Sequence, residues 1–139
     1  MAFNLRLIIY SALLIPLFSP PSLPILAQNE QQIAQKVNCA SPQTTVEMNI
    51  CAGQEYKAAD RKLNQVYRQL QSKLSGSQKQ RITQAQLAWI KFRDANCDYE
   101  RGQFEGGTMA SSTGTSCLAG MTEKRTKELE NYLQDLESR

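Results

Sequence analysis

Four cysteines, Cys39, Cys51, Cys97 and Cys117, carry the most definite chemistry in this sequence of 139 residues. Gaps of 11, 45 and 19 residues separate them, no C-x-x-C pair occurs, and the chain contains no histidine. Structural zinc sites usually take their ligands in close pairs, so this spacing argues against a metal. An even number of cysteines in a small exported chain is typical of disulfides. We therefore expect two disulfides and no metal or cofactor.

Catalytic residues are not expected. The chain lacks a histidine to serve as a base, and it has no G-x-S-x-G turn to present a nucleophilic serine. Oxidised cysteines are not nucleophiles. Glu100 and Glu105 form a carboxylate pair of the kind that cleaves glycosides, but both fall in a segment without a rigid support. The sequence therefore favours a binding protein over an enzyme.

The first 27 residues have the layout of a secretory signal. Arg6 is their only charge, an apolar run follows it, and the small residue Ala27 suits signal peptidase. The apolar run is too short to anchor the chain comfortably in a bilayer. We predict a signal peptide over 1–27, a polar lead-in over 28–38 and one domain over 39–137. The product is expected to be secreted or periplasmic, without stable membrane insertion after cleavage.

The charge of the mature chain excludes one class of partner. Without Arg6, 15 Lys and Arg residues face 13 Asp and Glu residues. Nucleic-acid binding requires a concentrated basic face, which this balance does not supply. No nucleic-acid partner is expected.

Three helices are expected to position the cysteines. Thr44 and Glu47 form a capping box, and apolar residues then recur every three or four positions as far as Leu74. A second helix is predicted over 78–98, with Ile82, Trp89 and Phe92 in its buried stripe, and a third over 117–136. Short connections favour an antiparallel hairpin of the first two helices. The fold class is an all-α, antiparallel three-helix domain with a long Gly/Ser-rich loop over 99–116.

This layout brings all four cysteines to one end of the domain. The pairing Cys39–Cys51 with Cys97–Cys117 is permitted, and so are crossed pairings. The sequential pairing is preferred because each bridge then closes one local connection. Sequence alone leaves the connectivity open.

Several polar and aromatic residues are expected to have structural roles. Tyr67 and Trp89 lie on the core stripes. Arg93 lies near the buried stripe and therefore needs an acceptor, for which Asp60 on the first helix is the candidate. Asp94 is expected to bond loop backbone near Cys97. Asn64 and Gln86 are candidates for hydrogen bonds between helices.

The same residues resemble the N-terminal domain of the LprI-type lysozyme inhibitors. The resemblance rests on Cys39 and Cys51, D-x-x-L-N-x-x-Y from Asp60 to Tyr67, Q-x-x-W-x-x-x-R-D-x-x-C from Gln86 to Cys97, and Cys117 after a Gly-rich stretch. It covers nearly the whole mature chain. It implies an exported, helical, disulfide-linked domain and, for the named members, inhibition of lysozyme. The founding members are lipid-anchored, whereas this chain has no cysteine at the start of its mature part.

The segment 99–116 is the predicted binding element. A lysozyme cleft contains two catalytic carboxylates, to which serine and threonine hydroxyls could donate as sugar hydroxyls do. Acidic flanks would attract a basic lysozyme and raise the association rate. The predicted partner-binding residues are Tyr99, Glu100, Phe104, Glu105, Ser111, Ser112 and Thr113. The alternatives are a flexible connector in this segment and, for the protein as a whole, an envelope interaction module whose partner is another cell-wall enzyme or an assembly factor.

Overall fold

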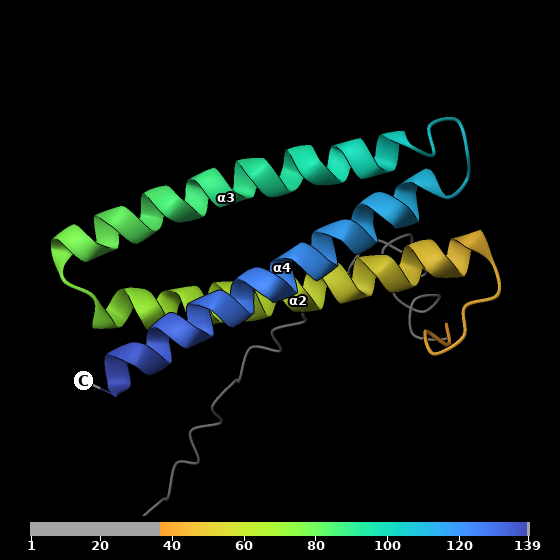
Figure 1. The fold of residues 1–139 in the computed structure, drawn as a ribbon. Helices are drawn as coiled ribbons and strands as arrows, with labels where there is room; N and C mark the ends of the chain where they lie inside the picture. The colour runs from red at the N-terminus through yellow and green to blue at the C-terminus, as the bar shows by residue number, and fades with distance from the viewer. Residues whose placement is uncertain (1–36, 139) are drawn as a thin grey trace, which may run out of the picture.

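A computed structural model describes residues 37–138 as three helices joined by short connections. The helices are α2 (Thr45–Lys73), α3 (Gly76–Gly102) and α4 (Ala110–Glu137), and no strand occurs in this part of the chain (Figure 1). The all-α prediction is confirmed. The predicted signal peptide and most of the lead-in lie outside the described residues.

The start of α2 follows the sequence expectation. The Thr44 hydroxyl accepts from the Glu47 amide at 3.2 Å, and the Glu47 carboxylate accepts from the Thr44 amide at 3.1 Å. This reciprocal pair is the predicted capping box, and it satisfies amides that the first turn of a helix leaves without partners. It therefore defines where α2 begins.

The core lies mainly between α2 and α4. Leu63, Val66 and Leu70 of α2 are buried against Leu129 of α4. Partly buried apolar residues from all three helices surround this cluster: Tyr67, Leu74, Ile82, Trp89, Leu133 and Leu136. The core therefore occupies the end of the domain where α2 turns into α3.

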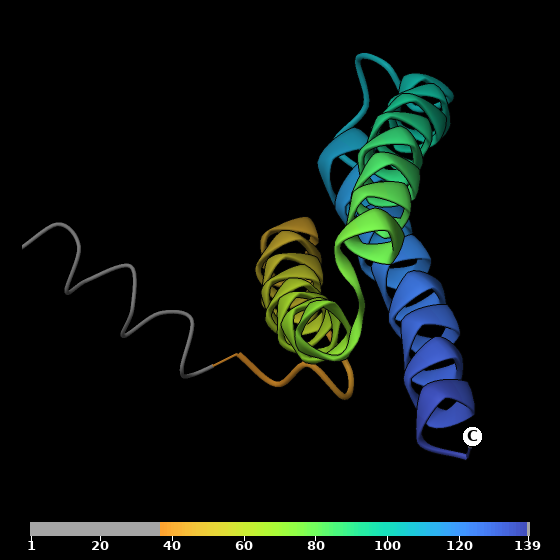
Figure 2. The same cartoon turned by 90° about the vertical axis from the view of Figure 1, so that its left-hand side faces the viewer.

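The predicted α2–α3 hairpin is correct in direction but wrong in packing. The two helices are antiparallel, yet α4 packs extensively along α2 and also contacts α3, while α2 and α3 approach each other closely at few positions. Figures 1 and 2 show α4 starting beside the end of α3 and diverging from it toward the C terminus. The physical reason is that α2 carries an apolar face and α4 buries mostly small residues, which let the two helices approach closely, whereas α3 buries Gln86 and Arg93.

Helix α3 has a different buried face from the one predicted. Its buried residues are Gln86, Arg93 and Cys97, whereas Phe92 of the predicted stripe is 61% exposed. Ile82 and Trp89 do pack against the core. No helix among the described residues combines the length and apolar character needed to cross a membrane.

Candidate functional site

Both disulfides lie at the end of the domain opposite the apolar core. Cys39 is bonded to Cys51 near the start of α2, and Cys97 near the end of α3 is bonded to Cys117 in the first third of α4. The sequential pairing is therefore the one observed, and all four cysteines gather at one end as expected. We call the two disulfides and the 103–109 connection between α3 and α4 the disulfide pole.

The connection is much shorter than the predicted loop. Helix α3 continues to Gly102 and α4 begins at Ala110, so the loop expected over 99–116 is reduced to seven residues, 103–109. Ser111, Ser112 and Thr113 lie in the first turn of α4. Serine, threonine and glycine are weak helix formers, but packing against neighbouring helices and the bond at Cys117 outweighs that preference.

Two glycines shape the pole. Gly106 has a φ of 77°, a conformation that other residues rarely adopt, and it forms the bend of the connection. Gly114 allows α3 and α4 to approach closely, because a Cβ there would lie 3.1 Å from Cβ of Arg101. The connection therefore joins two helix ends, those of α3 and α4, that are closely packed at Gly114.

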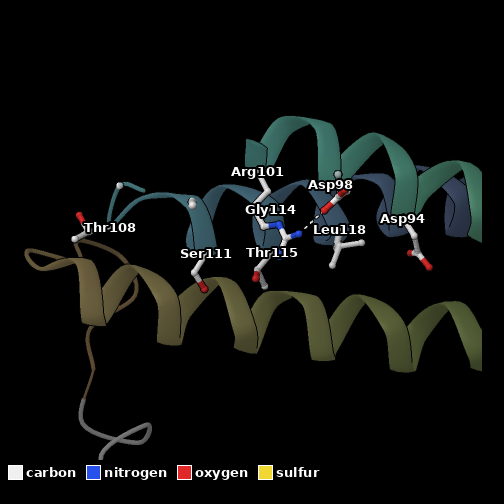
Figure 3. Close-up of a pocket in the computed structure, with 11 residues that line it drawn as sticks. Asp94, Asp98, Arg101, Thr108, Ser111, Gly114, Thr115 and Leu118 are labelled. Carbon is white, nitrogen blue, oxygen red and sulfur yellow. Dashed lines mark hydrogen bonds and ion pairs between the residues drawn. The ribbon is translucent and has the colours of Figure 1, made fainter. Parts of the chain in front are cut away.

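A pocket of about 590 Å³ opens between the ends of α3 and α4 (Figure 3). Asp94, Asp98 and Arg101 line it from α3, and Ser111, Gly114, Thr115 and Leu118 line it from α4. Arg101 donates a hydrogen bond to Asp98, and both side chains are exposed. The positive charge of Arg101 is therefore already neutralised in part. The pocket offers hydroxyls and carboxylates to a polar partner.

The structure separates the three predicted hydroxyls. Ser111 is exposed and lines the pocket, whereas Ser112 is 5% exposed and donates to the Met109 carbonyl at 3.1 Å. Thr113 is half-buried and lines a different hollow beside Cys39 and Cys51. Successive helical residues point about 100° apart, so the three cannot face one ligand together.

The remaining predicted binding residues are at the surface of the pole. Tyr99 is 69% exposed and Phe104 is 47% exposed. Glu100 accepts from Asn96 at 3.1 Å, and Glu105 lines a shallow hollow beside Arg101. Sequence reasoning overlooked Met109, a 39% exposed apolar residue that ends the connection and lines the hollow beside Cys39 and Cys51.

A buried polar layer separates the pole from the apolar core. The guanidinium carbons of Arg93 and Arg125 lie 5.1 Å and 5.9 Å from the ring centroid of Trp89. Arg125 donates to Gln86 at 3.0 Å, and Arg93 donates to Thr122 at 3.4 Å. These contacts join α3 to α4 and explain why α3 turns polar residues inward, since each buried guanidinium requires acceptors or an aromatic face.

The predicted Arg93–Asp60 ion pair is wrong. Arg93 donates to Asp94 from Nε at 2.9 Å and from Nη2 at 2.7 Å, and the Asp60 carboxylate instead accepts from Asn64 at 3.0 Å. The position of α2 relative to α3 explains why Asp60 is not the partner. Tyr56, one helical turn before Asp60, is the α2 residue beside Arg93, and its ring centroid lies 5.7 Å from the guanidinium carbon. The Asp94 carboxylate thus accepts hydrogen bonds from Arg93, whereas it was expected to bond loop backbone near Cys97.

The two candidate hydrogen bonds between helices have different outcomes. Gln86 does bridge, because its oxygen accepts from Arg125 of α4. Asn64 bonds within α2, to the carbonyl and carboxylate of Asp60. Tyr67 adds a bridge that was not foreseen, since its hydroxyl lies 3.0 Å from that of Thr83 in α3.

Arg125 is the main structural residue that sequence reasoning missed. Its position on the periodic stripe of the last helix was a usable signal, because a charged residue on a buried stripe must have partners. Glu128, three residues later, supplies one at 2.8 Å. The site as a whole contains hydroxyls, carboxylates and exposed apolar groups, and the described residues hold no cluster of three or more potential metal ligands.

Comparison with known proteins identifies the chain's relatives. The family model described as "Lysozyme inhibitor LprI" matches residues 37–129. An uncharacterized protein of Rhizobium meliloti (strain 1021) is 32% identical over 114 residues, which cover 73% of this chain and 82% of that protein. No solved structure matches the chain.

Proposed function

Since the chain belongs to the LprI lysozyme-inhibitor family, we propose that it is an exported inhibitor of lysozyme that binds through the disulfide pole. The observation that carries the proposal is that three large apolar side chains at or next to the pole, those of Tyr99, Phe104 and Met109, are exposed, and that a polar pocket lies at the same end of the domain. Aromatic residues surrounded by polar groups are the usual anchors of protein interfaces.

The construction of the pole supports tight binding. Cys97–Cys117 fixes the two helix ends from which the connection emerges, with only seven residues between the helices. A segment held in one conformation before binding loses less conformational entropy when it docks. The affinity then depends on the contacts themselves rather than on ordering a loop.

The charges of the pole suit a basic enzyme locally. Asp98, Glu100 and Glu105 are exposed near one guanidinium, that of Arg101. Local acidic groups steer a cationic partner and raise the association rate without requiring an acidic protein overall. Among the hydroxyls, Ser111 is the one placed to donate to a cleft carboxylate, together with Thr115 on the same pocket.

Inhibition assays test the proposal. The exported protein, with its disulfides intact, is titrated against animal-type and phage-type lysozymes on cell-wall substrate, and inhibition of at least one class is expected. An absence of inhibition at micromolar concentration across these enzymes would contradict the proposal and favour an envelope module with another partner. Inhibition is binding and not catalysis, so turnover of the cell-wall substrate by the protein alone is not expected.

A matched pair of variants tests the surface. Phe104→Ala is expected to raise the Kd for the inhibited lysozyme about 10- to 100-fold, since burying a phenylalanine contributes about 1.5–3 kcal/mol. Tyr132→Ala is the control, because Tyr132 has nearly the same exposure, 45% against 47%, but lies near the opposite end of the domain. Equal effects of the two variants would contradict binding through the pole. Deletions that reach Gly114 are unsuitable because they remove the first turn of α4.

A further inference from the structure

Helix α3 carries an apolar stripe on its solvent-exposed side. Phe92 and Tyr99 are 61% and 69% exposed, and three alanines beside them are exposed as well. We call this set the α3 stripe: Ala85, Ala88, Phe92, Ala95 and Tyr99. The inward face of the same helix holds Gln86, Arg93 and Cys97. Ala85, at one end of the stripe, also lines a hollow beside Leu70 and Leu136, whereas Phe92 and Tyr99 face solvent. Exposed apolar residues that follow one another along a helix are typical of a surface that has a partner.

We propose that the α3 stripe binds the α3 stripe of a second copy of this chain, with the two helices antiparallel. Its members are spaced three, four, three and four residues apart. This is the spacing with which one helix presents a continuous seam to another helix, and it extends over two heptads. Figure 1 shows no other helix on the outer side of α3 among the described residues.

The sizes of the residues match in this arrangement. When Phe92 lies opposite Ala95 of the second copy, the same register places Tyr99 opposite Ala88 of the second copy. Gly102 at the end of α3 then lies opposite Ala85 of the second copy. Every large residue meets a small one, and two-fold symmetry repeats each contact. Large residues facing small ones fill an interface without overlap or voids.

Charges on the edge of the stripe select the antiparallel direction. Lys91 and Asp98 lie seven residues apart along one edge, and Lys91 has no ion pair among the described residues. In the antiparallel register Lys91 lies close to Asp98 of the second copy, and the contact occurs twice. An in-register parallel pairing would instead place Phe92 against Phe92 and Tyr99 against Tyr99, and it would not bring Lys91 beside Asp98. Self-complementarity in both size and charge favours a second copy over an unrelated partner.

The α3 stripe and its edge share two residues with the surface proposed to bind lysozyme, namely Tyr99 and Asp98, and Asp98 also pairs with Arg101 of its own helix. An antiparallel pair directs the two disulfide poles to opposite ends, so both connections stay accessible. The test therefore uses Phe92, which lies outside the pole. Its side chain contributes to the stripe but not to the described core.

Sedimentation equilibrium of the exported protein tests the interface. The wild type is expected to form a dimer, and Phe92→Lys is expected to raise its dissociation constant about 100-fold or more, because two phenylalanines leave each interface. Leu87→Lys is the control, since Leu87 is 57% exposed on the same helix but lies off the stripe. Lys91→Glu is expected to weaken the dimer, and Lys91→Glu combined with Asp98→Lys to restore it.

Each alternative outcome is decisive. A wild type that stays monomeric at sub-millimolar concentration, or a Leu87→Lys variant that dissociates as readily as Phe92→Lys, would overturn the proposal. Circular dichroism and the Tm check that the variants fold. If Phe92→Lys abolishes lysozyme inhibition while the wild type is a monomer, the stripe belongs to the lysozyme interface and the dimer is refuted. A dimeric wild type that inhibits lysozyme and a dimeric wild type that does not are both compatible with the dimer proposal. The dimer proposal and the lysozyme proposal can therefore fail separately.

Discussion

Replacing Arg93 by alanine tests whether the buried polar layer holds α3 on the domain. The Arg93 side chain is 9% exposed, and its guanidinium lies between the rings of Trp89 and Tyr56. Its only ion-pair partner among the described residues, Asp94, is 55% exposed. Packing of the stem and contact with the two rings should therefore contribute more than the ion pair, which solvent screens.

The expected loss of unfolding free energy is about 2–3 kcal/mol. Truncation to alanine removes two buried methylenes, Cγ and Cδ, which contribute about 0.8 kcal/mol each. Two ring contacts contribute about 1 kcal/mol each, and the ion pair with a half-exposed carboxylate contributes less than about 1 kcal/mol. Relief of the desolvation of the guanidinium offsets part of this total. For a domain of this size the Tm is expected to fall by about 10 °C or more.

Denaturant and thermal unfolding of a small series of variants decide the reasoning. Arg93→Met keeps the apolar stem and leaves the Asp94 carboxylate in solvent, so a change within about 1 kcal/mol is expected. Arg81→Ala is the control, an exposed arginine of the same helix, with a change below about 0.5 kcal/mol. An unchanged Tm for Arg93→Ala would refute the structural role. Equal losses for the alanine and methionine variants would show that charge dominates over packing.

Three further substitutions probe the pole and the polar layer. Gly114→Ala is expected to destabilise the domain by about 1–2 kcal/mol, because the added Cβ would overlap the Arg101 side chain of α3. Gly120→Ala in the same helix is the control, since its Cβ would enter open space and should stabilise the domain by up to about 1 kcal/mol. Thermal unfolding compares the two variants, and equal effects would contradict the close approach of α3 and α4 at Gly114. Gln86→Leu leaves a buried guanidinium nitrogen without its acceptor and should cost about 1–3 kcal/mol in denaturant unfolding, so a neutral result would show that water replaces the amide. Removing both Cys97 and Cys117 by serine substitution should cost about 3 kcal/mol and weaken lysozyme inhibition in parallel, and full inhibition by the double variant would show that the disulfide does not preorganise the connection.

Local sequence rules were sufficient for α2, and they predicted two disulfides at one end of the domain without determining the pairing. The capping box at Thr44 and the stripe ending near Leu74 are determined by neighbours in the sequence, and both are present. Antiparallel neighbours bring the end of one helix beside the start of the next, which places all four cysteines at one end but leaves crossed pairings open. The sequential pairing is the one that the structure shows. These features depend little on how tightly each pair of helices packs.

The inward face of α3 could not be predicted by the same rules. Periodicity assigns apolar residues to the core, so Phe92 was placed inside and Arg93 was given a partner across the α2–α3 hairpin. The structure instead buries Arg93 beside Trp89, because α4 and not α2 is the main neighbour of this face. Such a choice depends on pairing between distant helices, which composition does not encode.

The length of the connection was misjudged for a related reason. Glycine, serine and threonine over 110–116 reduce intrinsic helix propensity, and a propensity argument therefore extends the loop. In the folded chain these small residues permit α4 to start close to α3, as Gly114 does against Arg101. Residues that weaken an isolated helix can thus be the ones that allow two helices to approach.

The distribution of stabilising interactions explains how the pole can keep large apolar side chains at its surface. Large apolar side chains are buried at the α2–α3 turn, where Leu70 and Leu129 are almost fully enclosed. The pole buries smaller groups, including Ala52 and Ala119, and two disulfides lie there in place of a large core. A crosslink stabilises mainly by restricting the unfolded chain, and therefore it needs little buried apolar surface nearby. An aromatic residue such as Phe104, 47% exposed, can then remain at the surface without loss of the domain's own core.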